Sequence, residues 1–171
     1  MKNPKEFKPI FSRDYYMNSS NAFIYDKPRL VKSLKGFTGI LAIIYIEEAF
    51  PFEPAVEYVN TRPCIFLCKV INGSYNMSEL FKYISLVQTN DIELWLTENC
   101  SFCLYDMERD VLRLKWRSIL QEFSPIFNIK NNPGNLFQYT LESLEKDDPK
   151  IIATEIKEPL DRNAFPFAKD A

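Results

Sequence analysis

The feature that most constrains the fold is the run at residues 40–46, Ile-Leu-Ala-Ile-Ile-Tyr-Ile, whose only polar group is the Tyr45 hydroxyl. Its β-branched side chains are stiff and favour a pleated strand, and its length is that of a strand rather than of a helix. Gly39 precedes the run and Glu47 follows it. A strand that is apolar on both faces has to be covered on both faces. The run therefore predicts the central strand of a sheet that is packed by helices.

Turn and cap signals divide the first half of the chain into further elements. In chain order, the pattern predicts a strand at 22–25, a helix at 26–36, a short helix at 54–60 and a strand at 64–71. Asn72 and Gly73 then form a strong turn signal. Asn76, with Glu79 three residues later, resembles a capping box and predicts a helix that continues to about Val87.

The clearest alternation of apolar and polar residues begins at Ile92, Leu94 and Leu96. Together with the segments 102–105 and 112–117 it predicts three antiparallel strands joined by hairpins. A helix competes over 108–123, because four apolar residues there also fit a helical stripe: Leu112, Trp116, Ile119 and Phe123. We favour a strand to about residue 117 and a helix over 118–123.

Less regular sequence follows residue 124. The pattern predicts a loop at 125–134, a helix at 136–144 (with a strand at 137–141 as the alternative) and a short strand at 151–156. The expected fold is a single α+β or mixed α/β domain over residues 1–171. Its sheet is mixed or antiparallel, with a C-terminal meander packed by several helices, and residues 1–20 and 159–171 are expected to be loosely ordered.

Missing residue types exclude whole classes of chemistry. The chain contains no histidine, which removes Ser-His-Asp, Cys-His and His-Glu-x-x-His sites. Only four glycines are present, and none is arranged as a phosphate-binding loop. Residues 1–11 lack the apolar core of a signal peptide, and the run at 40–46 is far shorter than the ~20 residues of a membrane span. We therefore expect a cytoplasmic protein with reduced thiols.

The four cysteines form the sharpest constellation, Cys64-x-x-x-Cys68 and Cys100-x-x-Cys103. Four thiolates can hold a structural zinc. In a strand, however, Cys64 and Cys68 would lie on one face about 13 Å apart, whereas two ligands of one zinc lie about 4 Å apart. Buried thiols that pack as small apolar side chains are the favoured interpretation, with a four-cysteine zinc site as the alternative.

Charge is distributed unevenly along the chain. Residues 36–110 carry four basic and eleven acidic side chains, although the whole chain has a net charge of only −2. The candidate residues are Glu47, Glu48, Glu53, Glu57, Asp91, Glu93 and Glu98. They fit a solvated acidic face, a docking surface for a basic partner, or the ligands of a divalent metal in a metal-dependent enzyme. An acidic middle repels phosphate backbones, so we expect no nucleic-acid partner.

Trp95 lies among these acids, on the strand face opposite to Ile92, Leu94 and Leu96. If that face is open, an exposed tryptophan between carboxylates is a candidate hot spot for protein binding. If helices cover both faces of the sheet, Trp95 is a core residue. The sequence leaves both interpretations open.

In size, acidic middle and aromatic content the chain resembles the immunity proteins of bacterial toxin systems, including those of contact-dependent growth inhibition. The resemblance implies a non-enzymatic protein without a cofactor, which binds one cognate toxin, often a nuclease, in a one-to-one complex. The acidic residues and Trp95 would then bind that toxin, with no membrane partner. An edge strand within 91–117 is a further candidate for pairing with a strand of the partner.

Overall fold

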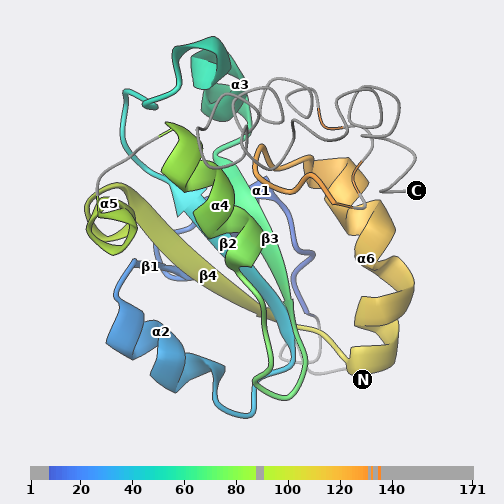
Figure 1. Ribbon diagram of the computed structural model, residues 1–171. Helices are drawn as coiled ribbons and strands as arrows, with labels where there is room; N and C mark the ends of the chain where they lie inside the picture. Colours follow the sequence, from blue (N-terminus) through green and yellow to red (C-terminus); the bar gives the residue numbers. More distant parts are fainter. Residues whose placement is uncertain (1–7, 88–90, 131, 133–134, 136–171) are drawn as a thin grey trace, which may run out of the picture.

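A four-stranded antiparallel sheet lies between two layers of helices in the computed structural model of the chain, which describes residues 8–87, 91–130, 132 and 135 (Figure 1). The elements are α1 (Arg13–Met17), β1 (Ala22–Ile24), α2 (Lys27–Leu34), β2 (Gly39–Tyr45), the 3₁₀ helix η2 (Glu53–Ala55), α3 (Val56–Thr61), β3 (Cys64–Val70), α4 (Ser78–Val87), α5 (Ile92–Asn99), β4 (Cys100–Asp106) and α6 (Arg109–Phe123).

Strand β2 is the central strand that the apolar run predicted. The strand order is β1-β4-β2-β3, so β2 pairs with both β4 and β3. Every residue of β2 is buried. Leu41, Ile43 and Tyr45 face one core, and the residues between them face the other. The prediction of an α+β domain with an antiparallel sheet is confirmed.

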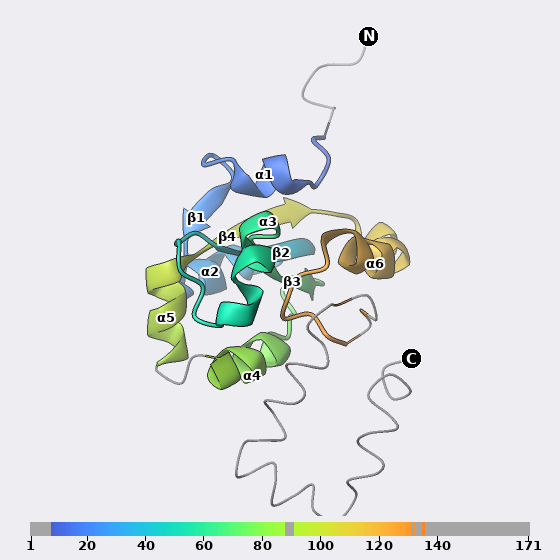
Figure 2. The ribbon, with the colours of Figure 1, turned by 90° about the horizontal axis from the view of Figure 1, so that it is seen from above.

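The two faces of the sheet are covered by different helices (Figure 2). Buried residues of α2, α3, α4 and α5 form one core with the loop at 126–129. Buried residues of α1 and α6 form the other core with Phe11. The strands therefore carry apolar side chains on both faces.

The predicted elements of the first half are confirmed. Asn72 and Gly73 both have positive φ, at 49° and 79°, as the turn signal requires. The Asn76 side chain accepts a hydrogen bond from the N–H of Ser78. The Glu79 carboxylate accepts hydrogen bonds from the N–H groups of Ile129 and Lys130.

The predicted C-terminal meander is wrong, because residues 92–99 and 109–123 are helical and only β4 is a strand. In α5, Trp95 and Leu96 are buried next to each other whereas Leu94 is 53% exposed, so the alternation did not mark two faces of a strand. Asp91 caps this helix by accepting a hydrogen bond from the N–H of Leu94.

In α6 the helical alternative for 108–123 is the correct one. Leu112, Ile119 and Leu120 pack on the sheet at helical spacing, whereas Leu114 is 83% exposed. A short alternating window fits both periods when the helix has a narrow apolar stripe.

The expectation that residues 1–20 are loosely ordered is wrong for residues 8–20. Phe11 and Tyr16 are buried, and Ser12 caps α1 by accepting a hydrogen bond from the N–H of Tyr15. The remainder of that prediction, at 1–7 and 159–171, lies outside the described residues, as do the helix or strand predicted at 136–144 and the strand at 151–156.

Candidate functional site

The loop from Ile46 to Phe52 carries two of the predicted carboxylates beside the end of α5. The N–H of Ile46 donates a hydrogen bond to the carbonyl of Asn99 over 2.9 Å. Phe50 anchors the loop in the core, where its ring lies 5.1 Å from that of Tyr45. Glu47 and Glu48 are exposed on this fixed loop, close to the helix end that carries the exposed Glu98.

The outer face of α5 continues this acidic surface. Asp91, Leu94 and Glu98 are exposed at helical spacing, and Leu94 stands between the two carboxylates. Ile46, at the start of the loop, is 48% exposed. We call the surface formed by Glu47, Glu48, Asp91 and Glu98, with Ile46 and Leu94, the acidic face.

The other predicted carboxylates lie elsewhere. Glu53 and Glu57 are exposed on η2 and α3, which Figure 1 places at the top of the molecule, away from α5. Glu93 is half-buried, and its Oε2 atom is enclosed without a hydrogen-bond partner among the described residues. Burial first, and then the charge of Glu93, raise the pKa of Tyr25. Glu93 therefore belongs to the inner side of α5.

Trp95 is a core residue, so its interpretation as an exposed hot spot is wrong. It is only 6% exposed, and its ring stacks on that of Tyr45 with 5.8 Å between centroids. The reason is that residues 92–99 form a helix and not the predicted strand. The helix places Trp95 on the inner face of α5 and leaves Leu94 outside.

The four cysteines are free thiols that the sheet divides into two pairs. Cys64 and Cys103 lie on the face covered by α1 and α6, and Cys68 and Cys100 lie on the opposite face. The prediction that Cys64 and Cys68 share a face is wrong. The strand register shifts between Ile43 and Ile44, and the extra residue reverses the side on which Cys64 points.

Metal-site alternatives find no support in the part of the chain that the structure describes. No three cysteine, aspartate or glutamate side chains there come together as ligands of one ion. Burial raises the pKa of Cys68 to about 11 and that of Cys103 to about 12, so these thiols are neutral near pH 7. Neither the four-cysteine zinc site nor a carboxylate cluster is formed by these residues.

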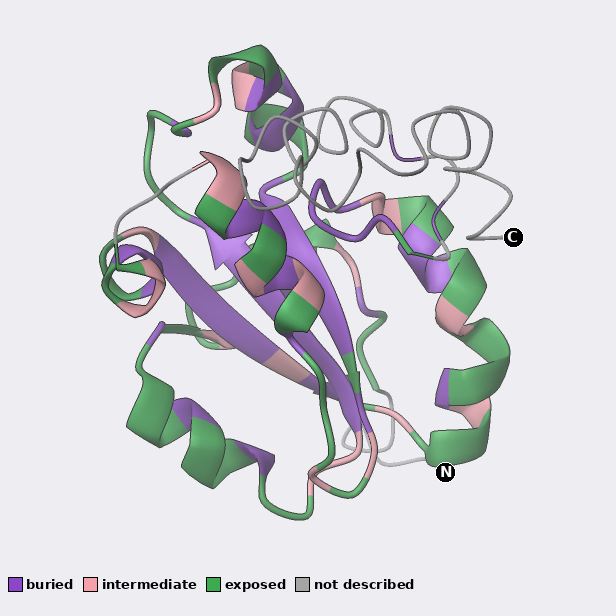
Figure 3. Cartoon of the chain, in the orientation of Figure 1, coloured by how far each residue is buried: buried purple, intermediate pink, exposed green. Residues whose placement is uncertain are grey.

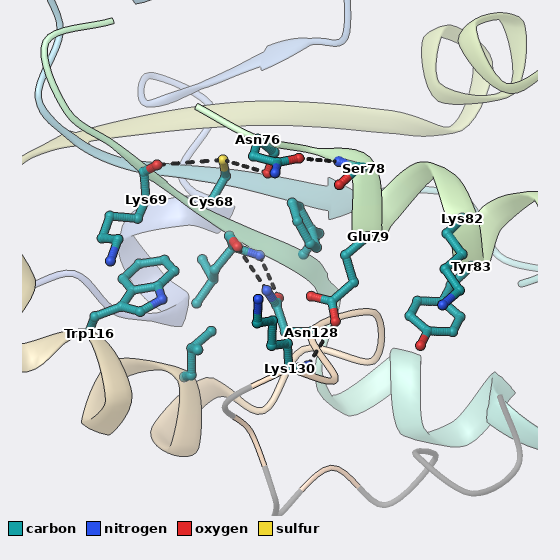
Figure 4. A pocket seen from close by; sticks show the side chains of 13 residues that line it. Cys68, Lys69, Asn76, Ser78, Glu79, Lys82, Tyr83, Trp116, Asn128 and Lys130 are labelled. Carbon is teal, nitrogen blue, oxygen red and sulfur yellow. Dashed lines mark hydrogen bonds between the residues drawn. The ribbon is translucent and has the colours of Figure 1, made fainter. Parts of the chain in front are cut away.

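Sequence patterns did not indicate a groove of about 670 Å³ that the structure shows between α4 and α6 (Figure 4). Its floor is the outer edge of β3, from Phe66 to Lys69. Trp116 and Leu120 line it from α6. The helical alternative for 108–123 was the signal for this wall, since it sets Arg113, Trp116 and Leu120 on one side of a helix.

The charged side chains on the groove are mostly basic. Lys69, Lys82 and Lys130 line it together with a single carboxylate, Glu79. A second hollow, of about 600 Å³, shares Lys69 and Asn76 with the groove and adds Arg113. This basic surface is separate from the acidic face, which lies on the 46–52 loop and α5.

The chain matches no protein-family model, no curated protein and no solved structure. Within the described residues, no helix has both the length and the apolar character that crossing a membrane requires.

Proposed function

We propose that this protein acts by binding a basic partner protein through the acidic face, without catalysis of its own. The observation that carries the proposal is the composition of that face. It combines exposed carboxylates at Glu47, Glu48 and Glu98 with two exposed apolar side chains, Ile46 and Leu94. Apolar contact at the centre with charge at the rim is the usual anatomy of a protein interface.

Rigidity supports the same proposal. Phe50 and Trp95 pack edge to face with 6.4 Å between ring centroids, so the loop and α5 share one aromatic cluster under the acidic face. A surface held in its binding geometry loses little conformational entropy on association. Its negative charge would also speed the encounter with a positively charged partner.

The form of this function that we favour is neutralisation of a toxin. The resemblance to bacterial immunity proteins in size, charge and aromatic content implies a cognate toxin, often a nuclease, whose substrate-binding surface is basic. Carboxylates placed on that surface would block the access of nucleic acid to it.

The test is capture of the partner from the native host at low salt, identification by mass spectrometry, and titration of the two purified proteins. The double variant Glu47→Lys with Glu48→Lys is expected to weaken binding at least tenfold, because it reverses two charges on the face. Glu122→Lys with Asp14→Lys is the matched control, since both residues are exposed on other elements and the change in net charge is equal.

The toxin interpretation predicts in addition that one equivalent of the protein abolishes the activity of the partner. Equal affinity of the double variant and the control would overturn the assignment of the acidic face. A bound partner that keeps its full activity would overturn neutralisation while leaving protein binding in place.

A further inference from the structure

The groove on β3 is one end of a trough that follows the strand. The first hollow lies along residues 66–69, and the second continues to Ile71, Ser74 and Tyr75. Lys69 and Asn76 line both hollows, so the two adjoin each other. Figure 4 shows the strand passing between α4 and α6 at this place. Such a shape suits an extended ligand better than a compact one.

The main chain of β3 is covered along only part of this edge. The N–H of Phe127 donates to the carbonyl of Ile65 over 3.0 Å. The Asn128 side chain pairs with both main-chain groups of Leu67, accepting from its N–H at 2.7 Å and donating to its carbonyl at 2.9 Å. Residues 126–128 thus occupy the position of a further strand as far as Leu67.

Lys69 is the next residue whose main chain points away from the sheet, because alternate residues of an antiparallel edge strand face outward. Among the described residues, no group accepts a hydrogen bond from its N–H. Its carbonyl receives only the long contact from the Cys68 thiol, at 3.8 Å. The trough therefore holds a donor and an acceptor in the geometry of strand pairing, immediately beyond the point where Asn128 stops.

The charge of the trough indicates the charge of the ligand that it would bind. Lys69, Lys82, Lys130 and Arg113 line it. The one carboxylate, Glu79, is already engaged with the N–H groups of Ile129 and Lys130. Trp116 adds a half-buried ring, 5.9 Å from the Lys69 ammonium, as an apolar wall.

We propose that the trough binds an extended, acidic segment of a partner protein, which pairs with β3 at Lys69 and extends the sheet by one strand. Main-chain hydrogen bonds provide affinity in this mode of recognition, and the flanking side chains provide specificity. Carboxylates on the added strand would meet the four cations, and an apolar side chain would pack on Trp116. The surface is independent of the acidic face and has the opposite sign.

The test uses the full chain and a fluorescein-labelled octapeptide of alternating valine and glutamate, with both ends blocked. Fluorescence anisotropy is expected to show binding that weakens at high salt. Lys69→Glu with Arg113→Glu is expected to weaken it at least tenfold. The matched control is Lys27→Glu with Lys32→Glu on α2, where both residues are exposed and neither lines the trough.

Two further measurements separate strand pairing from simple charge attraction. Hydrogen exchange at the Lys69 amide is expected to slow at least tenfold when the peptide is bound, and this readout uses no variant. A peptide that is N-methylated at alternate residues is expected to lose binding. Equal binding of the methylated peptide, or of a valine–lysine peptide, would overturn the proposal.

Other occupants are distinguished in the same set of experiments. Dimers of the protein alone that disappear in Lys69→Glu with Arg113→Glu would assign the trough to a second copy and overturn the proposal. A photo-crosslinker at position 116 that joins to residues 136–171 of its own chain would overturn it too. Glu47→Lys with Glu48→Lys is expected to leave peptide binding unchanged, so this result is independent of the function proposed for the acidic face.

Discussion

Each cysteine of this protein fills space in one of the two cores. Burial is the first cause of the raised thiol pKa at all four positions, and the same cause raises the pKa of the Tyr45 hydroxyl to about 12. Neutral, buried thiols are poor nucleophiles. The cysteines, which formed the sharpest constellation in the sequence, pack as small apolar side chains.

These thiols are expected to make the fold less stable at alkaline pH. In the unfolded chain a thiol titrates near pH ~8.5, whereas the folded pKa of Cys68 is about 11 and that of Cys103 about 12. A raised folded pKa gives stability that is complete below the unfolded pKa and is lost as pH rises toward the folded pKa. The free energy of unfolding is thus expected to fall from about pH 8.5 upward, by roughly 1.4 kcal/mol per pH unit for each thiol.

Urea unfolding between pH 7 and 10 in the presence of a reductant measures this slope. Cys103→Ala is expected to make the slope shallower by the contribution of one thiol, and comparison of slopes removes the constant cost of altered packing. A free energy of unfolding that stays level to pH 10 would contradict the prediction.

Among the elements, β3 shows how a loop can complete a sheet. Asn128 is 4% exposed and its side chain pairs with the edge of the strand in the way a peptide group would. The main-chain carbonyl of Asn128 in turn accepts hydrogen bonds from the side chains of Asn132 and Asn135. The loop that the sequence predicted at 125–134 is confirmed over the described residues 125–130 and 132, but nothing in the sequence indicates that one asparagine covers a strand.

Asn128→Ala is expected to lower the free energy of unfolding by roughly 2–4 kcal/mol, because it leaves the buried N–H and carbonyl of Leu67 unpaired. Urea denaturation followed by circular dichroism measures the change. Asn60→Ala is the control, since Asn60 is exposed on α3, and it is expected to change stability by less than about 0.5 kcal/mol. Similar effects of the two variants would show that Asn128 does not act as a strand partner.

For the molecule as a whole, the second face of the sheet depends on the segment before α1. Phe11 contacts the rings of Tyr15, Tyr16, Tyr105 and Phe123. The Tyr105 hydroxyl donates to the carbonyl of Pro9, and Arg13 donates to the carbonyl of Thr61. In Figure 3 the outer surface of α6 is mostly exposed, so this helix covers the sheet with a narrow stripe and needs the N-terminal segment beside it.

Phe11→Ala is therefore expected to lower the free energy of unfolding by roughly 3–5 kcal/mol, the usual cost of deleting a buried aromatic ring. Phe23→Ala serves as the comparison. Its ring is 37% exposed, so we expect a loss of less than about 1.5 kcal/mol. Thermal and urea unfolding of both variants measure these changes. If Phe11→Ala lowers the free energy of unfolding no more than Phe23→Ala does, the segment before α1 is not needed to stabilise the second core.

The central strand, a second apolar strand at 64–71 and the Asn72-Gly73 turn could be read from the sequence, because apolar runs and turn residues act locally. The antiparallel pairing of the two strands could not. The sequence also determined that no histidine chemistry is available. It did not determine the identity of α5 and α6, since helix and strand periods overlap in short windows, and the choice depends on which face packs on the sheet. Only the tertiary structure shows that Trp95 is buried, that the cysteines lie in pairs on the two faces of the sheet, and that a trough follows β3. All three depend on which segments lie beside one another, and that is settled by packing between residues far apart in the chain.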